Sequence, residues 1–504
     1  MSKHNEFTVR FFLMSPLTFI FLCITKFIYG VAELVDWLQN LGWTRKLVLA
    51  GASTTIGLAV PVGFSIGVVN TPAGIIKAWC NESVAAHYNI ALDSTGLDSI
   101  WSCIVSIYLI GGMVGSLGGA WVADRIGRKG GLVLAAIFLL VAALMFIVSK
   151  PLNSIEVVLL GRIVAGLGGG LVTTIMPMYL TELAPIEVRG ATGVLCPLGL
   201  SLGVPISQGL GFPMIFGSEN CWNYLLGMYA VLTLLSAIAL PFLPESPKYL
   251  YTIRGLRQKA IKELTSLRQL PAEFVVGELE EKTDSEPETW SIVKLIANRP
   301  LRIKLLLVCA LQGGQQFSGI NAVFYYSVRI FEMAGLSQAN AQYASLGAGS
   351  INFIVAAIMI PVINLFPRRA MAILSCTFGT AFLVVLSFAI TYTVTFSWML
   401  YLSTVSLFGY IIMYGIGLGP IPFFIGSELF DLGPRSAAMA LGSVANWAGN
   451  FIVGMTFLRL NNKLGPYVFL LFATSTALLA LFLKVCLPET NVVTLAKRRK
   501  QSLK

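Results

Sequence analysis

The stretch Glu182-Leu183-Ala184-Pro185-Ile186-Glu187-Val188-Arg189-Gly190 ends a long apolar run, and Glu428-Leu429-Phe430-Asp431-Leu432-Gly433-Pro434-Arg435 ends another, half a chain length later. Two further pairs repeat at nearly the same offset: residues 124–129 with 366–369, and residues 243–246 with 487–490. Each copy lies where an apolar run stops. A parallel repeat of a several-helix unit is typical of membrane transporters, which place their substrate between the two halves. The repeat therefore predicts two related halves and a cavity between them.

The composition is that of a protein that crosses a membrane many times. Of the 504 residues, 56% are hydrophobic and only 12% are charged. Soluble domains carry about 25% charged residues. The formal charge of +11 does not predict a nucleic-acid partner, because the basic residues gather at the ends of apolar runs, as in cytosolic loops of membrane proteins. Membrane lipid is the expected neighbour. The basic tail 497–500 is interpreted as a topology signal, with contact to anionic headgroups as the alternative.

Twelve apolar runs are long enough to span a bilayer, which takes about 20 residues each. They predict an all-α membrane protein with six spans in each half and one long polar stretch between the halves. The expected organisation is an N-terminal segment 1–46, a first half 47–243, short amphipathic linker helices in 244–301, a second half 302–487 and a basic tail 488–504. The predicted spans are 47–69, 99–123, 131–149, 157–180, 191–213, 222–243, 302–327, 343–365, 370–392, 398–425, 436–458 and 464–486.

Basic residues predict the orientation of the spans. Arg45, Arg128, Arg189, Arg368 and the linker fall on one side if both termini are cytosolic, and the opposite loops contain few Lys or Arg residues. On that outer side, Asn81-Glu82-Ser83 forms a sequon, so Asn81 is a predicted glycosylation site. The apolar segment 11–30 is expected to be an interfacial or re-entrant anchor rather than a signal peptide.

The eight cysteines have no metal-binding spacing, so no metal or cofactor is predicted. Most are expected to be small apolar helix residues. Cys80 and Cys221 both fall on predicted outer loops, which leaves a bridge between them as the alternative.

Side-chain amides gather in three of the predicted spans. Gln312, Gln315, Gln316 and Asn321 lie in 302–327, Asn352 lies in the next span, and Asn446-Trp447 and Asn450 lie in 436–458. Neutral amides both donate and accept hydrogen bonds, which suits an uncharged, polyhydroxylated solute. The alternative is that they join helices to one another. The size of the cluster favours a ligand cavity.

Residues 417–424 supply the second feature of a sugar site. Gly417-Leu418-Gly419-Pro420-Ile421-Pro422 precedes Phe423 and Phe424. Such a sequence breaks a membrane helix, which is tolerated where backbone lines a cavity. Aromatic rings next to the break suit the apolar C–H faces of a sugar, although a kinked packing helix gives the same pattern.

Several functions are excluded because the sequence lacks the residues or motifs that they need. No acidic residue lies in the middle of a predicted span, and a proton-coupled transporter usually needs one, so downhill uniport is favoured. No GxxxxGK[ST] motif is present, so ATP does not drive transport. The glycine-rich stretch 166–170 lies within a span and indicates close helix packing. No nucleophile–base constellation is present, so the chain is not expected to be an enzyme.

The chain resembles the sugar porters of the major facilitator superfamily, and most closely the animal facilitative glucose transporters, across roughly residues 47–490. The segment 315–327 (QQFSGINAVFYYS) is similar to a signature of that family, and 244–250 (PESPKYL) is specific to it. The segments 124–129, 182–190, 419–422 and 488–490, with Gly161-Arg162, also match.

The resemblance implies a hexose uniporter of the plasma membrane that works by alternating access. It implies that a hexose is bound by Gln312, Gln315, Gln316, Asn321, Asn352, Phe423, Trp447 and Asn450. It also implies a cytosolic set of salt bridges between the halves, formed by Arg125, Arg128, Arg162, Glu182, Arg189, Glu245, Arg368, Glu428, Arg435 and Glu489.

Several positions depart from the family pattern. Pro197 replaces a glutamine, Phe423 a tryptophan and Gly415 a glutamate, and Gln312-Gly313-Gly314 is nearer to the fructose-selective members. Ser65 stands where proton-coupled relatives carry an acid, which again favours uniport. Glucose is the first expectation. A fructose or mixed-hexose uniporter, a proton-coupled sugar symporter and a non-transporting sugar sensor are the alternatives.

Overall fold

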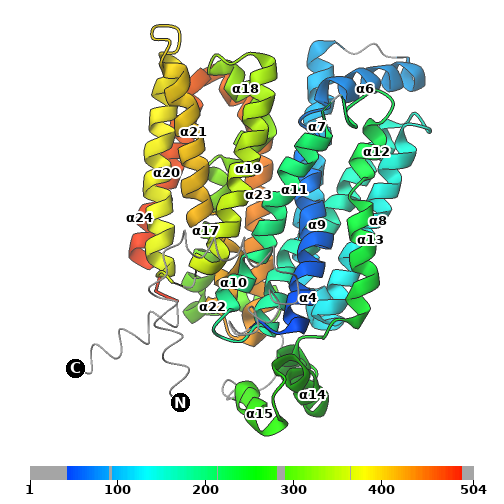
Figure 1. Ribbon diagram of the computed structural model, residues 1–504, viewed down its shortest axis with the longest axis vertical. Coiled ribbons are helices and arrows are strands. Elements are labelled where there is room, and N and C mark those ends of the chain that lie inside the picture. Colours follow the sequence, from blue (N-terminus) through cyan, green and yellow to red (C-terminus); the bar gives the residue numbers. More distant parts are fainter. Residues whose placement is uncertain (1–42, 90–92, 213, 281–289, 364, 491–504) are drawn as a thin grey trace, which may run out of the picture.

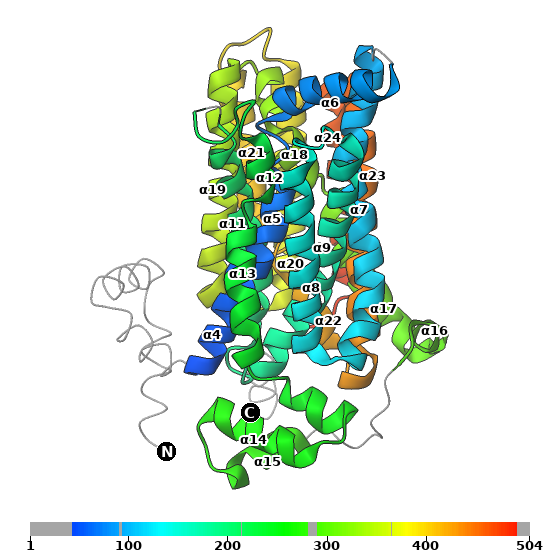
Figure 2. The ribbon, with the colours of Figure 1, turned by 90° about the vertical axis from the view of Figure 1, so that its right-hand side faces the viewer.

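The computed structural model describes residues 43–89, 93–212, 214–280, 290–363 and 365–490, and the regular elements in these ranges are all helices. The predicted anchor 11–30 and the basic tail residues 497–500 lie outside the described residues. The long helices stand side by side in one upright bundle (Figure 1). Helices α14 and α15 lie beneath one end of the bundle, called here the linker end, and α6 lies across the opposite end, called the α6 end (Figure 2).

The first half follows the predicted spans. The first span is continuous but contains one π-helical stretch, Thr55–Ala59, between α4 and α5. The helices of this half are α4 (Arg45–Thr54), α5 (Val60–Gly67), α6 (Ala73–Tyr88), α7 (Ser94–Arg125), α8 (Gly127–Ser149), α9 (Ile155–Leu183), α10 (Arg189–Gly193), α11 (Leu195–Leu210), α12 (Trp222–Gly227) and α13 (Ala230–Ala239).

The second half repeats the pattern with two broken spans. The span 302–327 is divided into α17 (Arg302–Phe317) and α18 (Ile320–Met333), and the span 398–425 into α21 (Met399–Ile416) and α22 (Ile421–Leu429). The second break falls at residues 417–420, as the glycines and prolines there predict. The other helices are α19 (Gln338–Val362), α20 (Arg368–Thr391), α23 (Leu432–Leu464) and α24 (Val468–Cys486).

Among the described residues, ten helices are long and apolar enough to cross a membrane. The two predicted spans outside this set are 302–327 and 436–458, which carry most of the amide cluster. Polar residues in a membrane helix are costly unless they face partners or water. The two least apolar spans are therefore the ones to examine for a function.

Helices α7 and α9 pack with their backbones in contact. A Cβ added to Gly115 would lie 2.2 Å from the carbonyl oxygen of Leu167, and one added to Gly170 would lie 2.2 Å from that of Gly112. Small residues allow membrane helices to approach this closely. The predicted packing role of residues 166–170 is confirmed.

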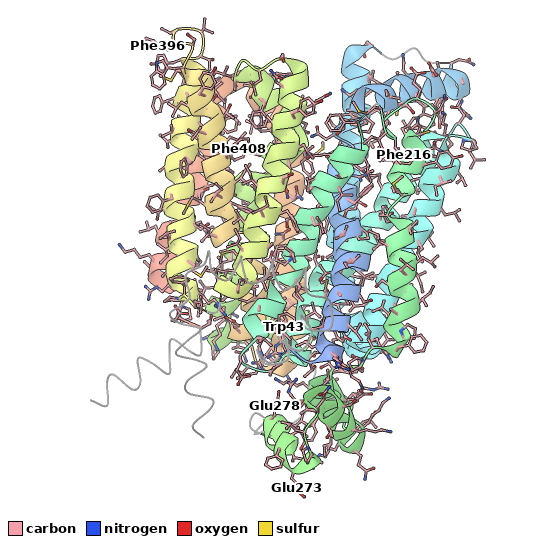
Figure 3. The ribbon with its side chains drawn as sticks, in the orientation of Figure 1. Trp43, Phe216, Glu273, Glu278, Phe396 and Phe408 are labelled. Atoms are coloured by element: carbon pink, nitrogen blue, oxygen red, sulfur yellow. The ribbon has the colours of Figure 1, made fainter. Side chains whose placement is uncertain are left out.

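The linker forms a small helical layer at its end of the bundle. It contains α14 (Arg257–Arg268), α15 (Ala272–Glu280) and the short α16 (Ile292–Ala297). Glu273 and Glu278 of α15 project beneath the bundle (Figure 3). Arg268 binds Glu278 at 2.7 Å and also donates to the carbonyl of Leu183 at 2.8 Å, which fixes the layer to the end of α9.

At the α6 end, the predicted sequon lies within a helix. Asn81 is half-buried in the middle of α6, and the Ser83 hydroxyl donates to the carbonyl of Asn153 at 2.6 Å. Cys80 and Cys221 are free thiols, so the alternative of a bridge between them is not realised, although the neighbouring Trp79 and Trp222 rings lie 4.7 Å apart.

Two glycines of α7 provide a matched test of this packing. Gly115→Ala is expected to destabilise the fold by about 1–3 kcal/mol, because its methyl group collides with the α9 backbone. Gly118→Ala should be tolerated, since nothing lies within 4 Å of its added Cβ. Thermal unfolding of both variants in detergent measures the difference. Equal stability of the two variants would contradict this packing.

Candidate functional site

A cavity lies between the two halves, with about 770 Å³ of atom-free space including open solvent at its mouth. The first half contributes a largely apolar wall, and the second half contributes the amides. None of the lining residues among the described residues is charged. The lining residues are Ile66, Thr173, Pro197, Leu200, Ser201, Val204, Gln315, Gln316, Asn321, Phe324, Asn352, Ala356, Tyr414, Gly415, Gly419, Pro420, Phe423, Asn446, Trp447 and Asn450.

Both helix breaks of the second half lie beside this cavity. Between α17 and α18, Gly319 adopts φ +87°, which side chains disfavour, and an added Cβ there would meet the Phe472 ring at 2.4 Å. Farther along α18, Tyr326 leaves helical geometry at φ −127° and ψ 20°. Between α21 and α22, the carbonyls of Leu418 and Gly419 have no helical partner, because Pro422 has no N–H and the N–H of Phe423 donates to Pro420 instead. Such carbonyls need other donors inside a membrane.

Gln315 supplies those donors, and Gln312 donates to the next carbonyl group along, at the start of α22. Gln315 Nε2 donates to the carbonyls of Leu418 and Gly419, both at 2.9 Å, and Gln312 Nε2 donates to the carbonyl of Pro422 at 2.9 Å. Asn446 Nδ2 in turn donates to both glutamine side chains, at 2.9 and 2.6 Å. Gln312 is buried and is not part of the cavity lining. Its geometry is that of a support for the break rather than of the hexose contact expected from the sequence.

The other four amides keep groups available for a ligand. Asn321 Nδ2 donates to Gln316 Oε1 at 2.6 Å, and the Tyr325 hydroxyl donates to Asn450 Oδ1 at 3.1 Å. Among the described residues, no hydrogen bond engages Gln316 Nε2, Asn450 Nδ2 or the amide of Asn352, and all three residues line the cavity. A buried polar group without a partner is costly, so these groups are suited to a polar ligand or to water.

Trp447 joins the two halves at the cavity. Its indole Nε1 donates to the Thr173 hydroxyl on α9 at 3.1 Å, and its ring meets the edge of Tyr108 on α7 at 5.5 Å. Gly112 is required beneath it, because an added Cβ would lie 2.4 Å from the ring. The indole N–H is therefore already used, and the ring face is what remains for a ligand. Phe423 also lines the cavity.

Closer to the linker end, Ser443 lies between two hydroxyls of the first half. Its Oγ is 2.8 Å from Ser116 Oγ and 3.0 Å from Thr173 Oγ1. Sequence reasoning missed Thr173, Ser116 and Ser443. Hydroxyl residues are common in membrane helices, and only the packing of α23 against α7 and α9 distinguishes these three.

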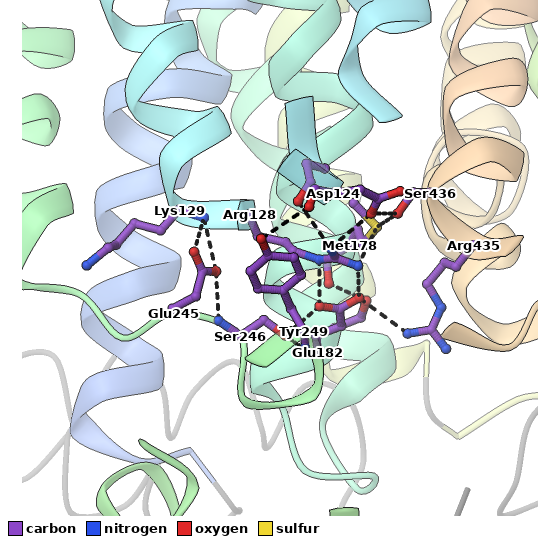
Figure 4. A network of polar contacts seen from close by, with 12 residues as sticks. Asp124, Arg128, Lys129, Met178, Glu182, Glu245, Ser246, Tyr249, Arg435 and Ser436 are labelled. Carbon is purple, nitrogen blue, oxygen red and sulfur yellow. Dashed lines mark hydrogen bonds and ion pairs between the residues drawn. The ribbon is translucent and has the colours of Figure 1, made fainter. Parts of the chain in front are cut away.

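A charged network closes the linker end (Figure 4). The buried carboxylate of Glu182 accepts two hydrogen bonds from Arg128, at 3.0 and 3.2 Å, and one from Ser246. From the second half, Arg435 Nη1 approaches Glu182 at 3.6 Å. Ser436 Oγ donates to Asp124 Oδ1 at 2.8 Å. These contacts join the start of α23 to the first half.

Most members of this network join residues within one half, which corrects the expectation of salt bridges between the halves. Arg128 pairs with Glu182 inside the first half, and Arg368 pairs with Glu428 at 3.6 Å inside the second. Arg435–Glu182 is an ion pair that crosses between the halves.

Glu245 and Glu489 occupy equivalent places in the two halves. Glu245 accepts from the backbone N–H of Lys129 at 3.2 Å, at the start of α8. Glu489 accepts from that of Arg368 at 2.9 Å, at the start of α20. A carboxylate at a helix N-terminus satisfies free N–H groups and the helix dipole. Both acids therefore anchor a helix start, and burial raises the pKa of Glu245.

Comparison with known proteins identifies the family. A family model described as "Sugar (and other) transporter" matches residues 52–500. The chain belongs to the sugar transporter family. This is a family of transporters and not of enzymes.

The relatives of this sugar transporter match nearly the whole chain. Facilitated glucose transporter member 4 of Homo sapiens is 36% identical over 457 residues, which cover 89% of this chain and 89% of the relative. Member 1 of Gallus gallus is 35% identical over 451 residues, 89% of this chain and 91% of the relative. Member 5 of Equus caballus is 33% identical over 453 residues, 89% and 90% of the two chains.

Solved structures show that the fold is that of the major facilitator superfamily. The proton:xylose symporter XylE bound to 6-bromo-6-deoxy-D-glucose has a TM-score of 0.73 to this chain at 21% identity, covering 88% of this chain and 96% of that chain. The xylose transporter XylE from E. coli in a partially occluded inward-open conformation has a TM-score of 0.69 at 22% identity, covering 89% and 99%.

Three arginines of this sugar transporter lie outside the ion pairs expected of them. Arg162 lies toward the α6 end of α9, fully away from the linker end, and donates to the carbonyls of Ile104, Ser65 and Val105 at 3.0, 2.6 and 3.3 Å. Arg125 is exposed and lies against the Trp121 ring at 5.7 Å. Arg189 is half-buried, and its Nε has no hydrogen-bond partner among the described residues.

The sequence wrongly suggested that Arg162 lies at the linker end. The motif Gly161-Arg162 does not by itself indicate at which end of its span it lies. The guanidinium stacks on Tyr108 at 4.5 Å and joins the first span to α7 and α9 through backbone carbonyls. Its role is to hold three helices of the first half together.

Lys248 provides a pH test of the region where the two halves meet at the linker end. Its burial, with the nearby charges of Arg189 and Arg435, lowers the pKa of Lys248 to about 7. In the unfolded chain a lysine keeps its proton up to about pH 10.4. The cost of charging Lys248 in the fold is therefore present in full below about pH 7 and is relieved as the pH rises toward 10.

Lys248→Met is accordingly expected to melt at a higher temperature than the wild type at pH 6, with a difference that shrinks by pH 9. Thermal unfolding in detergent at both values measures this. A difference in melting temperature that does not change with pH would show that the lysine is not charged at such a cost.

Proposed function

We propose that this protein carries a neutral hexose, with glucose as the first candidate, across the plasma membrane by uniport. The observation that carries the proposal is the uncharged cavity, in which Gln316, Asn352 and Asn450 present amide groups without protein partners. Sugar hydroxyls both donate and accept, so they match such amides, and the faces of Trp447 and Phe423 match the apolar side of a sugar ring.

The relatives support hexose as the cargo. Relatives that match along nearly the whole chain are named facilitated glucose transporters, and one XylE structure was solved with a glucose derivative bound. Fructose or mixed-hexose transport is the second candidate. It is favoured by Gln312-Gly313-Gly314. At Gly415 an added Cβ would meet Val355 at 2.7 Å, so a side chain there would reshape the cavity.

Uniport rather than proton symport is supported by the surroundings of Arg162. Its three nitrogens donate to backbone carbonyls, one of them that of Ser65, and no carboxylate forms an ion pair with it among the described residues. Proton coupling in a membrane protein needs a buried group whose charge changes during the cycle. Ser65 cannot serve as that group, since a hydroxyl does not titrate in the physiological range.

Alternating access is supported by different contacts at the two ends of the cavity. At the linker end the halves meet through the buried Glu182 and Arg435. At the α6 end they meet through neutral groups: Asn70 donates to the carbonyl of Phe324 at 3.3 Å, and Gln208 donates to Ser345 at 3.4 Å. Both sets are few enough to break and re-form as the halves rock.

The linker end is proposed to face the cytosol, with both termini on that side, because its loops are rich in arginine and lysine. Asn81, on the opposite side, stays a predicted glycan acceptor. Asn81 lies within α6, and its Oδ1 is buried without a hydrogen-bond partner among the described residues. A mobility shift on glycosidase treatment would reveal the glycan.

Uniport predicts uptake that equilibrates and does not accumulate. In proteoliposomes, labelled glucose should reach the same internal concentration with or without an imposed proton gradient. Accumulation above the external concentration that collapses with a protonophore would identify a symporter instead. Competition by fructose, galactose and mannose in the same assay distinguishes the candidate hexoses.

Three asparagine substitutions distinguish the loss of a substrate contact from the unspecific effect of removing a side-chain amide. Asn352→Ala and Asn450→Ala should each raise the KM for hexose by about tenfold, because one to two hydrogen bonds of about 1 kcal/mol each are lost. Asn462→Ala is the matched control, since this exposed residue lies on the same helix as Asn450, away from the cavity. Unchanged KM in both cavity variants would place the substrate elsewhere.

A further inference from the structure

The short helix α16 lies at the side of the bundle rather than beneath it. Figure 2 shows α16 to one side of the bundle, next to the linker-end tip of α17 and at about the height of α14 and α15. One face is seated on the protein: Leu295 is fully buried, and the backbone N–H of Trp290 points to the carbonyl of Gly433 at 3.5 Å. This seat is the start of α23, the segment that also carries Arg435 and Ser436.

The opposite face of α16 is apolar and uncovered. Val293 is 76% exposed and Ile296 is 49% exposed. The surface continues onto the first turns of α17, where Ile303 and Leu306 are 49% and 53% exposed. Exposed apolar side chains at the side of a membrane bundle, at the level where its spans begin, lie where lipid is their solvent.

Basic residues border this apolar face. Lys294, Arg299, Arg302 and Lys304 fall within residues 290–306, and this segment of the sequence contains no aspartate or glutamate. Lys294 Nζ lies 4.8 Å from the centre of the Trp290 ring. Arg302 Nε and Nη2 donate to the carbonyls of Ile296 and Ala297, at 3.0 and 3.3 Å, which caps α16 and joins it to α17.

We propose that residues 290–306 form a docking surface for the headgroups of anionic phospholipids in the leaflet at the linker end. The apolar side chains would enter the boundary of the acyl chains, and Trp290 would lie at the headgroup level, where tryptophans concentrate. Lysine and arginine beside a membrane surface attract negatively charged lipids. The charge of this surface therefore selects phosphatidylserine over the zwitterionic phosphatidylcholine.

The test uses the full-length protein in liposomes of phosphatidylcholine that contain brominated phosphatidylserine or, at equal mole fraction, brominated phosphatidylcholine. Bromine quenches nearby tryptophan, and the signal of Trp290 is the difference between the wild type and Trp290→Phe. The expected result is at least twofold stronger quenching of this signal by the brominated phosphatidylserine. Equal quenching by the two lipids would overturn the proposal.

Charge variants test which residues select the lipid. The triple variant K294Q/R299Q/K304Q should lose the preference, and Arg302 is left unchanged because it caps α16. R254Q/K259Q/K262Q is the matched control, since these exposed residues lie on the linker layer beneath the bundle. Loss of the preference in both variants, or in neither, would contradict the assignment.

Hexose uptake in liposomes of phosphatidylcholine alone verifies that each variant is folded. If the triple variant fails this check, the salt dependence of the wild type decides. Preferential quenching by brominated phosphatidylserine should fade as the ionic strength is raised, because salt screens exposed charges. A preference that persists at high salt would overturn the proposal.

Discussion

A backbone carbonyl set free inside a membrane must find a donor, and this constraint shapes the centre of the molecule. The break between α21 and α22 leaves the carbonyls of Leu418 and Gly419 outside regular helix, and Gln315 donates to both. Gln312 donates to the carbonyl of Pro422 in the first turn of α22. Asn446 then fixes both glutamines. Without these amides the break would be too costly to keep, and without the break the cavity would lose one of its walls.

The two halves consequently have different tasks. The first half is held together by close glycine packing of α7 on α9 and by Arg162, and it offers the cavity a mainly apolar wall. The second half contains both breaks and all of the amides that line the cavity. Motion between the halves needs contacts that can part. The crossing contacts include a charged set at the linker end, the hydrogen bonds of Ser443 and Trp447 to the first half, and a neutral set at the α6 end.

Sequence reasoning predicted an all-helical membrane protein, and ten of its predicted spans correspond to helices of the described residues that are long and apolar enough to cross a membrane. It also predicted the break at residues 417–420. It could not assign each amide to its task, because the carbonyls that Gln315 binds lie about a hundred residues later, between α21 and α22, and meet it only through the packing of these helices. It misplaced Arg162, since a short motif does not show how far along a membrane span it lies. It also interpreted ion pairs within each half as ion pairs between the halves. Contacts such as Trp447 to Thr173 arise from packing alone.

The central claim is that the amides are divided between two tasks, support of the helix break and contact with the sugar. A structure of the protein with a bound hexose tests this directly. We expect sugar hydroxyls within hydrogen-bond distance of Gln316 Nε2, Asn352 and Asn450 Nδ2, while Gln315 Nε2 stays on the carbonyls of Leu418 and Gly419. A sugar bound away from these three residues, or a Gln315 that leaves both carbonyls with the break intact, would contradict the claim.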